Sequence, residues 1–231
     1  MTATFDGVQT RVDKVIVEDG AVPVWTAGPN ETADLPGLVV IPSIFGPNED
    51  LLAQMRTLSD IALTVVMDPF WRQGGGAVDY ADHDAAIGRL DGFDRSRCRD
   101  DVAAVAAWTR ARGNGNVVAL GICFGGPWTL IGAEKGWFTA AATWHGSRME
   151  GVLDRLGGLA APLRLHFGEV DPITPPAAID AIRAHFSGHP DCRIVVHEGA
   201  DHGFSHEGSS WDAGASAAAL ADLRGLLIDA R

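Results

Sequence analysis

One short segment constrains the fold of this chain more than any other. An apolar run over residues 117–122 leads directly into Gly121-Ile122-Cys123-Phe124-Gly125-Gly126, and an apolar segment compatible with a helix follows over residues 128–133. A strand that turns this sharply into a helix needs small residues, so Gly121 and Gly125 keep β-carbons away from the points where its two arms approach. The segment predicts a nucleophile elbow with Cys123 at a helix N-terminus, where the helix dipole favours a thiolate. The alternative is a buried strand whose glycine-rich turn happens to contain a cysteine.

The remainder of the chain alternates between strand and helix patterns. Two short runs at residues 11–17 and 22–27, joined by Glu18-Asp19-Gly20, predict an N-terminal antiparallel hairpin. Further strands are predicted at residues 38–41, 63–67, 117–122, 139–144, 163–167 and 193–197, and helices at 49–61, 99–112, 128–133, 149–159, 176–186 and 213–229. Residues 72–95 show little periodicity and predict an excursion over one end of the sheet, with a short helix near 82–90. We therefore expect a single α/β domain over residues 1–231, with a mostly parallel central sheet flanked by helices.

Composition narrows the function. With 18 basic and 30 acidic residues among 231, the formal charge of −12 disfavours nucleic acids and anionic membranes as partners. The three cysteines show no metal-ligand spacing, and no zinc, calcium or phosphate-loop pattern occurs, so we expect no metal and no cofactor. The chain opens without a secretion signal and contains no apolar run of membrane-spanning length. These features predict a cytoplasmic protein that acts on a small molecule; its oligomeric state is left open.

Three residues suited to nucleophilic catalysis each follow a different predicted strand. Cys123, Asp171 and His202 come after the runs at residues 117–122, 163–167 and 193–197, and functional residues of parallel sheets lie beyond these strand ends. Their order along the chain is that of an α/β-hydrolase. His202 would take the thiol proton and later return it to the leaving group, while Asp171 would orient the imidazole. Alternatively, Asp171 only starts a turn and His202 only lies in a loop; Asp201, next to His202, is poorly placed to orient it.

An oxyanion formed during such a reaction needs donors that point at it. The backbone N–H of Phe124 follows the nucleophile, and that of Ile44 follows the predicted strand at residues 38–41. These two N–H groups are the expected oxyanion hole.

The chain resembles the dienelactone hydrolase family of α/β-hydrolases over nearly its whole length. The residues that carry this resemblance are Ile44-Phe45-Gly46-x-Asn48, Asp68-x-Phe70, Gly121-x-Cys123-x-Gly125-Gly126, Gly168-x-x-Asp171-x-x-x-Pro175 and Gly199-x-x-His202-x-Phe204. A cysteine in place of serine in the elbow is the most diagnostic of them. The resemblance implies a Cys123–His202–Asp171 triad that hydrolyses an ester or enol-lactone without a cofactor.

Three positions depart from that family pattern. In the family a glutamate precedes the Ile-Phe-Gly segment and helps to release the thiolate, whereas Ser43 stands here. Two arginines hold the substrate carboxylate in the family, and His206 and His83 stand at these positions. Imidazole does not replace a bidentate guanidinium in kind. We therefore expect a neutral or differently shaped ester or lactone as the substrate, and poor hydrolysis of anionic dienelactones.

Four further residues are candidates for the substrate pocket, together with Ser43, His83 and His206. They are Trp71, Trp144, His145 and Phe204. For the two tryptophans, simple burial in the core is an equally good interpretation, because large aromatic side chains are often buried.

Two readings of another class remain. The departures from the family pattern allow a binding or regulatory protein that keeps the hydrolase fold with reduced catalysis, since a fold does not fix a function. A redox-sensing thiol protein is also conceivable, but no resolving cysteine lies near Cys123 in the sequence.

Overall fold

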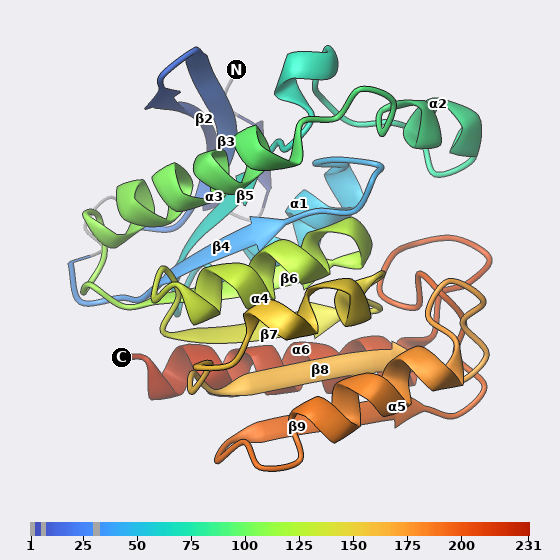
Figure 1. Ribbon diagram of the computed structural model, residues 1–231. Helices are drawn as coiled ribbons and strands as arrows, with labels where there is room; N and C mark the ends of the chain where they lie inside the picture. The colour runs from blue at the N-terminus through green and yellow to red at the C-terminus, as the bar shows by residue number, and fades with distance from the viewer. Residues whose placement is uncertain (1–2, 6–7, 30–32) are drawn as a thin grey trace.

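A single nine-stranded sheet runs through the computed structural model, which describes residues 3–5, 8–29 and 33–231 (Figure 1). Its spatial order is β1-β2-β3-β5-β4-β6-β7-β8-β9. The strands are β1 (Ala3–Phe5), β2 (Val8–Val17), β3 (Gly20–Ala27), β4 (Gly37–Ile41), β5 (Leu63–Met67), β6 (Val117–Ile122), β7 (Ala140–Trp144), β8 (Leu163–Gly168) and β9 (Cys192–His197).

Strand direction divides the sheet into two parts. From β1 to β5 the neighbours are antiparallel, including the β2–β3 hairpin that the sequence predicts. From β5 through β4 to β9 all neighbours are parallel. The carboxyl ends of β4, β6, β7, β8 and β9 therefore open onto one edge, where an α/β-fold places its working residues. The predicted α/β-hydrolase architecture, with its mostly parallel sheet and N-terminal hairpin, is confirmed.

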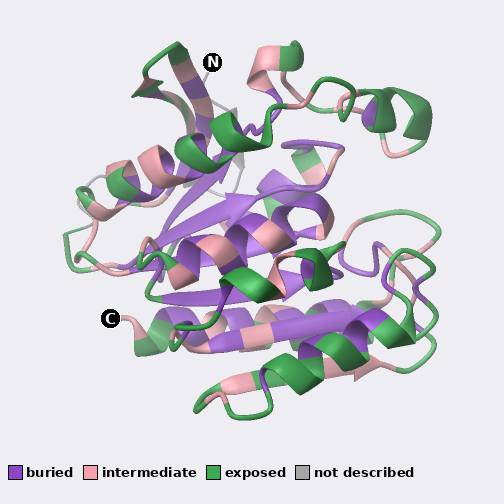
Figure 2. Ribbon diagram, viewed as in Figure 1, coloured by how far each residue is buried: buried purple, intermediate pink, exposed green. Residues whose placement is uncertain are grey.

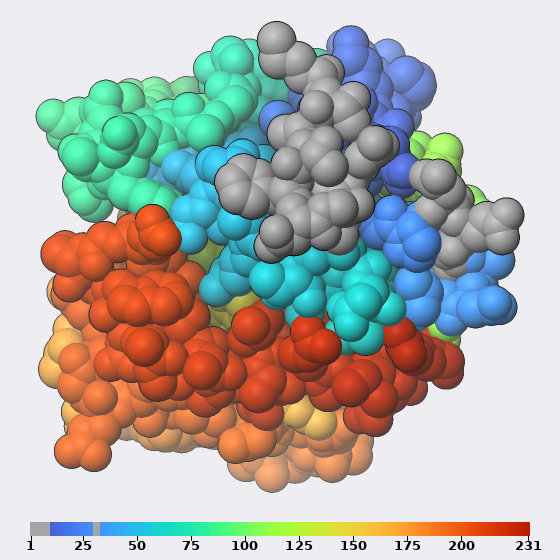
Figure 3. Space-filling model, turned by 180° about the vertical axis from the view of Figure 1, so that it is seen from behind, coloured from blue at the N-terminus to red at the C-terminus, as the bar shows by residue number. Residues whose placement is uncertain are grey.

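Helices cover both faces of the sheet (Figures 1 and 3). The helices are α1 (Glu49–Arg56), α2 (His83–Gly88), α3 (Arg95–Arg110), α4 (Gly126–Glu134), α5 (Pro176–His185) and α6 (Ala213–Asp229), with short 3-10 helices η1 (Trp71–Gln73), η2 (Cys123–Gly125) and η3 (Met149–Arg155). One core lies between the sheet and α3, α4 and α5, and the other lies between the sheet and α1 and α6. The inner parallel strands β4, β6 and β7 are buried throughout (Figure 2), as continuous apolar strands require.

Several helix boundaries differ from the sequence-based expectation. Helix α3 begins at Arg95 instead of residue 99, because the Asp94 carboxylate accepts hydrogen bonds from the N–H groups of Ser96 and Arg97. Helix α1 ends at Arg56, since the following residues form tighter turns such as Leu58 N–H to Met55 C=O. Residues 149–155 form a 3-10 helix in place of the predicted longer helix.

The excursion after β5 contains η1 and α2, and α2 lies at the outer end of this segment in Figure 1. Asp68 is fully buried directly after β5, where this segment begins. Its carboxylate stabilises the start of the segment by accepting hydrogen bonds from the N–H groups of Phe70 (2.9 Å) and Gly76 (2.6 Å). Across the described ranges, no helix combines the length and apolarity needed to cross a membrane.

Candidate active site

The turn at Cys123 is as tight as its glycines suggest. Cys123 adopts a left-handed backbone conformation, with φ of 49°, directly between β6 and α4. A β-carbon on Gly125 would lie 2.0 Å from the carbonyl oxygen of Ile41, and one on Gly121 would lie 2.6 Å from that of Gly125. Because both contacts are with backbone atoms, neither can be relieved by rotating a side chain. Glycine is therefore required at both positions for β6 to turn into α4 beside β4.

His202 and Asp171 form a hydrogen-bonded pair next to Cys123. The loops after β9 and β8 bring His202 Nδ1 to 2.7 Å from Asp171 Oδ2, although the residues are 31 positions apart in the chain. The Asp171 side chain is fully buried, and that of His202 is 19% exposed. This contact leaves Nε2, the other ring nitrogen of His202, for proton transfer with the thiol.

The charge state of His202 follows from its neighbours. Burial by itself lowers the pKa of His202, but hydrogen bonds with Asp171 and Cys123, and the charges of both, outweigh it and raise the pKa to about 10. At neutral pH the His202 ring therefore carries a proton beside the Cys123 sulfur. A cysteine paired in this way with an imidazolium is an activated nucleophile.

Asp171 is held in place by its own loop. Its Oδ1 accepts hydrogen bonds from the N–H groups of Ile173 (2.7 Å) and Thr174 (3.1 Å), which leaves Oδ2 for His202. The rival carboxylate, Asp201, accepts instead from the backbone N–H of His202 at 2.6 Å. Of the two carboxylates, Asp171 is thus the one bonded to the imidazole.

The two expected oxyanion donors lie just after two neighbouring strands, Phe124 after β6 and Ile44 after β4. Phe124 follows Cys123, and its ring packs against Phe70 with ring centroids 4.9 Å apart. Ile44 lies in the loop after β4, and no acceptor in the described part of the chain takes its N–H. Its carbonyl accepts a hydrogen bond from Arg89 Nη1 (3.3 Å), while Arg89 Nη2 binds the carbonyl of Gly76 (2.7 Å). Arg89 therefore ties the Ile44 peptide to the excursion after β5.

A second histidine, His145, lies against His202. His145, at the end of β7, is fully buried in a left-handed conformation with φ of 38°, and its ring centroid is 4.8 Å from that of His202. Its Nε2 lies 2.8 Å from Ser205 Oγ, whereas Nδ1 has no hydrogen-bond partner. Burial, with the nearby His202 and His206, holds the pKa of His145 well below 6.5. His145 is therefore a neutral neighbour of the triad.

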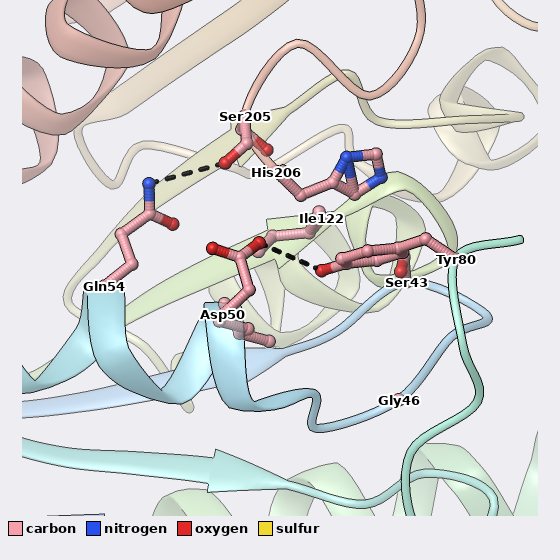
Figure 4. Close-up of a pocket in the computed structure, with 9 residues that line it drawn as sticks. Ser43, Gly46, Asp50, Gln54, Tyr80, Ile122, Ser205 and His206 are labelled. Atoms are coloured by element: carbon pink, nitrogen blue, oxygen red, sulfur yellow. Dashed lines mark hydrogen bonds between the residues drawn. The ribbon is translucent and has the colours of Figure 1, made fainter. Parts of the chain in front are cut away.

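Tyr80 and His206 are the aromatic residues that line a small pocket formed with Asp50 and Ser43 (Figure 4). The rings of Tyr80 and His206 have centroids 4.4 Å apart, and Tyr80 Oη donates to Asp50 Oδ2 at 3.3 Å. Burial, followed by the charge of Asp50, raises the pKa of Tyr80, so its hydroxyl stays protonated. Burial lowers the pKa of His206, although Asp50 opposes this. His206 is thus packed as a neutral ring beside a carboxylate.

A very small cavity of about 10 Å³ remains between these side chains. This volume is of the order that holds one water molecule. None of the residues that line it is lysine or arginine; they are Ser43, Gly46, Asp50, Leu51, Gln54, Tyr80, Ile122, Ser205 and His206 (Figure 4).

Two predicted pocket residues are at the edge of this region. Ser43 is buried, and its Oγ accepts a hydrogen bond from the N–H of Phe45 at 3.4 Å. His83 begins α2, is exposed, and packs edge-on against the Phe45 ring with centroids 5.3 Å apart.

The aromatic residues expected as pocket walls pack largely within the protein. Trp144 and Phe204 are 0% exposed and belong to the core beneath α6. The Trp71 indole N–H donates to Asp101 (3.0 Å), and its ring fills the space above Gly20 in the β2–β3 turn. Of these three, only Phe204 contacts the site, through the ring of His145 at 5.2 Å. For both tryptophans the core interpretation is the one that the structure supports.

Three residues near the triad escaped the sequence analysis: Asp50, Tyr80 and Ser147. Ser147 Oγ lies 3.7 Å from Cys123 Sγ. Tyr80 lies in a segment without periodicity, and Asp50 reads as an ordinary acidic residue in the first turn of α1. No local signal distinguished them. Within residues 3–5, 8–29 and 33–231, no group of three or more His, Cys, Asp or Glu side chains is placed to hold a metal ion.

Comparison with known proteins finds relatives that match most of this chain. The model of the dienelactone hydrolase family matches residues 22–226. A carboxymethylenebutenolidase of Pseudomonas putida is 29% identical over 201 residues, covering 84% of this chain and 85% of that protein. A putative carboxymethylenebutenolidase of Azospirillum brasilense is 26% identical over 211 residues, covering 84% and 86%.

Solved structures share the fold. A putative dienelactone hydrolase from Klebsiella pneumoniae superposes with a TM-score of 0.82 at 20% identity, covering 96% of this chain and 98% of the other. A dienelactone hydrolase-like promiscuous phosphotriesterase from metagenomic libraries gives a TM-score of 0.81 at 23% identity, with the same coverage.

Proposed function

The chain belongs to the dienelactone hydrolase family and is a hydrolase of ester or lactone bonds, and on this premise we propose that it works through a Cys123–His202–Asp171 triad. The observation that carries the proposal is the position of His202, bonded at 2.7 Å to buried Asp171 and facing Cys123 on the elbow. An imidazole oriented by a carboxylate and placed beside a thiol is the arrangement that nucleophilic acyl transfer requires.

The reaction then has two halves. The Cys123 thiolate attacks the substrate carbonyl, and the N–H groups of Ile44 and Phe124 stabilise the oxyanion. As the C–O bond breaks, protonated His202 gives its proton to the alkoxide and leaves a thioester on Cys123. Water, deprotonated by His202, attacks the thioester, and the returning thiolate leaves the carboxylic acid. In a lactone, the alkoxide and the acid belong to one molecule.

The charges around the cavity support a neutral substrate. The arginines expected from the family resemblance are replaced by His206 and His83, and the lining contributes the carboxylate of Asp50 instead of a cation. A substrate carboxylate placed there would meet neutral imidazole and a like charge, which disfavours it. We therefore propose neutral esters or lactones, with poor turnover of anionic dienelactones.

The test follows the acyl group. Purified protein is mixed with a neutral nitrophenyl ester, and the trapped enzyme is analysed by mass spectrometry. An acyl adduct on Cys123, with turnover that C123A lowers by about 10⁴-fold or more, is expected. C98A, which removes a buried thiol of α3, is the matched control and keeps its acylation. The absence of an adduct with a broad panel of esters would contradict the mechanism. Rapid hydrolysis of an anionic dienelactone that C123A abolishes would contradict the substrate class.

A second candidate is a family member with reduced catalysis that serves mainly to bind a ligand. The observation that favours it is the aromatic filling of the site, where Tyr80 and His206 leave a cavity of about 10 Å³. Binding of ester analogues near Cys123, without acylation, would be its signature.

A further inference from the structure

The backbone of the site singles out a residue that the proposed mechanism does not use. Among the described residues, the non-glycine residues with positive φ are Cys123 (49°), His145 (38°) and Arg148 (55°). Such conformations cost free energy and concentrate at functional sites. His145 and Arg148 are the two ends of the loop His145-Gly146-Ser147-Arg148 after β7, so this strained loop presents Ser147 to the nucleophile.

Ser147 contacts Cys123 twice. Its Oγ lies 3.7 Å from Cys123 Sγ, a hydrogen-bonding distance for sulfur, and its backbone N–H donates to the Cys123 carbonyl at 3.0 Å. The second bond fixes the peptide of Ser147 relative to that of the nucleophile. The hydroxyl is therefore placed beside the reacting sulfur by the backbone.

The same loop is also tied to the acid of the triad. The hydroxyl of Thr174 donates to the carbonyl of Gly146 at 3.2 Å, and the N–H of Thr174 donates to Asp171 Oδ1 at 3.1 Å. A β-carbon on Gly146 would lie 2.2 Å from Met149 Sδ, so the loop packs closely on the start of η3. Ser147 is thus held between the nucleophile and the acid, in a position that a merely solvent-facing serine would not need.

We propose that Ser147 is a further catalytic residue, whose hydroxyl donates a hydrogen bond to the Cys123 thiolate. The proposal rests on Cys123 being the nucleophile. The proton of the thiol goes to His202 Nε2, giving thiolate and imidazolium, and Ser147 keeps its own proton throughout. The bond stabilises the thiolate in the free enzyme and again when it leaves during hydrolysis of the thioester. It supplies help that Ser43 does not, because the Ser43 hydroxyl is turned to the N–H of Phe45 in its own loop.

The test separates thiolate formation from ester hydrolysis. The rate of Cys123 alkylation by iodoacetamide is measured against pH for wild type, S147A and S147T, with C98A,C192A as the common background. Loss of a hydrogen bond to an ionised group moves the midpoint of this profile upward by about one pH unit in S147A. S147T retains a hydroxyl and keeps the wild-type midpoint. In ester hydrolysis at neutral pH, kcat of S147A falls about tenfold with little change in KM.

A remote serine serves as control. Ser187 is exposed after α5, and its hydroxyl donates to the carbonyl of Ala184, so S187A leaves both profiles unchanged. An unshifted alkylation midpoint in S147A overturns the proposal, as does equal loss of hydrolysis in S147A and S147T. If the wild-type protein hydrolyses no ester but S147A still shifts the alkylation midpoint, the contact between Ser147 and the thiolate is supported. Only the proposed function is then contradicted.

Discussion

The loops that carry Cys123, Asp171 and His202 are fixed mainly by backbone contacts, whereas Tyr80 and His206, which line the small cavity, are held by packing between rings. On the catalytic side, Gly125 approaches the Ile41 carbonyl too closely for any β-carbon, and backbone N–H groups orient Asp171. Around the cavity, the Tyr80 ring packs at a tilt against the ring of His206, and the Tyr80 hydroxyl donates to Asp50.

This difference in how the two regions are held suggests that the reaction and the choice of substrate depend on different residues. Backbone contacts leave few alternative conformations, so the proposed catalytic groups are expected to keep their relative positions without substrate. Side-chain packing can be exchanged for other packing at modest cost. Substitutions of the residues around the cavity can therefore change the preferred substrate without disturbing the proposed triad. Substitutions on the two sides should therefore differ in size and kind.

Replacing the acid has the largest expected effect. D171N removes the hydrogen-bonded charge that raises the pKa of His202, and kcat should fall by about a thousandfold or more. In wild type the rate is retained above neutral pH and is lost as pH rises through about 10, because deprotonated His202 can no longer protonate the leaving group. In D171N this alkaline limb moves to lower pH. Rate profiles of kcat/KM against pH measure both effects.

Asp201 offers the matched control for that experiment. D201N alters a carboxylate bonded to the backbone N–H of His202 and not to its ring, so the loss should stay below about tenfold. Equal losses in D171N and D201N would show that Asp171 does not orient the imidazole.

Adding one methyl group to the elbow should test the backbone contacts through stability. G125A places a β-carbon 2.0 Å from the Ile41 carbonyl oxygen, and the free energy of unfolding should fall by about 3 kcal/mol or more. In G225A the new β-carbon lies in open space on α6, so the free energy of unfolding should instead rise by about 0.5–1 kcal/mol. Urea unfolding compares the two variants, and a near-neutral G125A would show that the turn can relax.

The smallest effect is expected from the side-chain-packed region. D50N removes the negative charge beside Tyr80 and His206, so kcat/KM for a carboxylate-bearing nitrophenyl ester should rise about threefold relative to a neutral one. Asp60 forms an ion pair with Arg224, and its side chain is 69% exposed. D60N should therefore leave this ratio unchanged. A D50N ratio equal to that of wild type would remove Asp50 from the selection of substrate charge.

Much of the catalytic side could be predicted because its signals are local. Glycines around Cys123 report a backbone constraint within six residues, and the carboxyl ends of parallel strands meet at one edge. The order of Cys123, Asp171 and His202 along the chain therefore implied their proximity. The distance of 2.7 Å between Asp171 Oδ2 and His202 Nδ1 agrees with that prediction.

The walls of the pocket could not be predicted in this way. Trp71 and Trp144 are large aromatic residues near strand ends, which suits either a wall or the core. The position of the Trp71 side chain is set by contacts with Gly20 and Asp101, which lie far from it in the sequence. The position of the Trp144 side chain is set by the packing of α6. Tyr80 gave no signal, since its partner Asp50 lies 30 positions away and is reached only through the fold.

The sequence by itself determined the strand–turn–helix at Cys123, the alternation that builds a parallel sheet, and the placement of acid and histidine at its edge. It determined these because glycine sterics and hydrophobic periodicity act between near neighbours in the chain. Only the tertiary structure decided that Ser147 lies beside the thiol and that Tyr80, His206 and Asp50 line one cavity. Those contacts join side chains from separate loops, whose meeting depends on how every helix packs on the sheet.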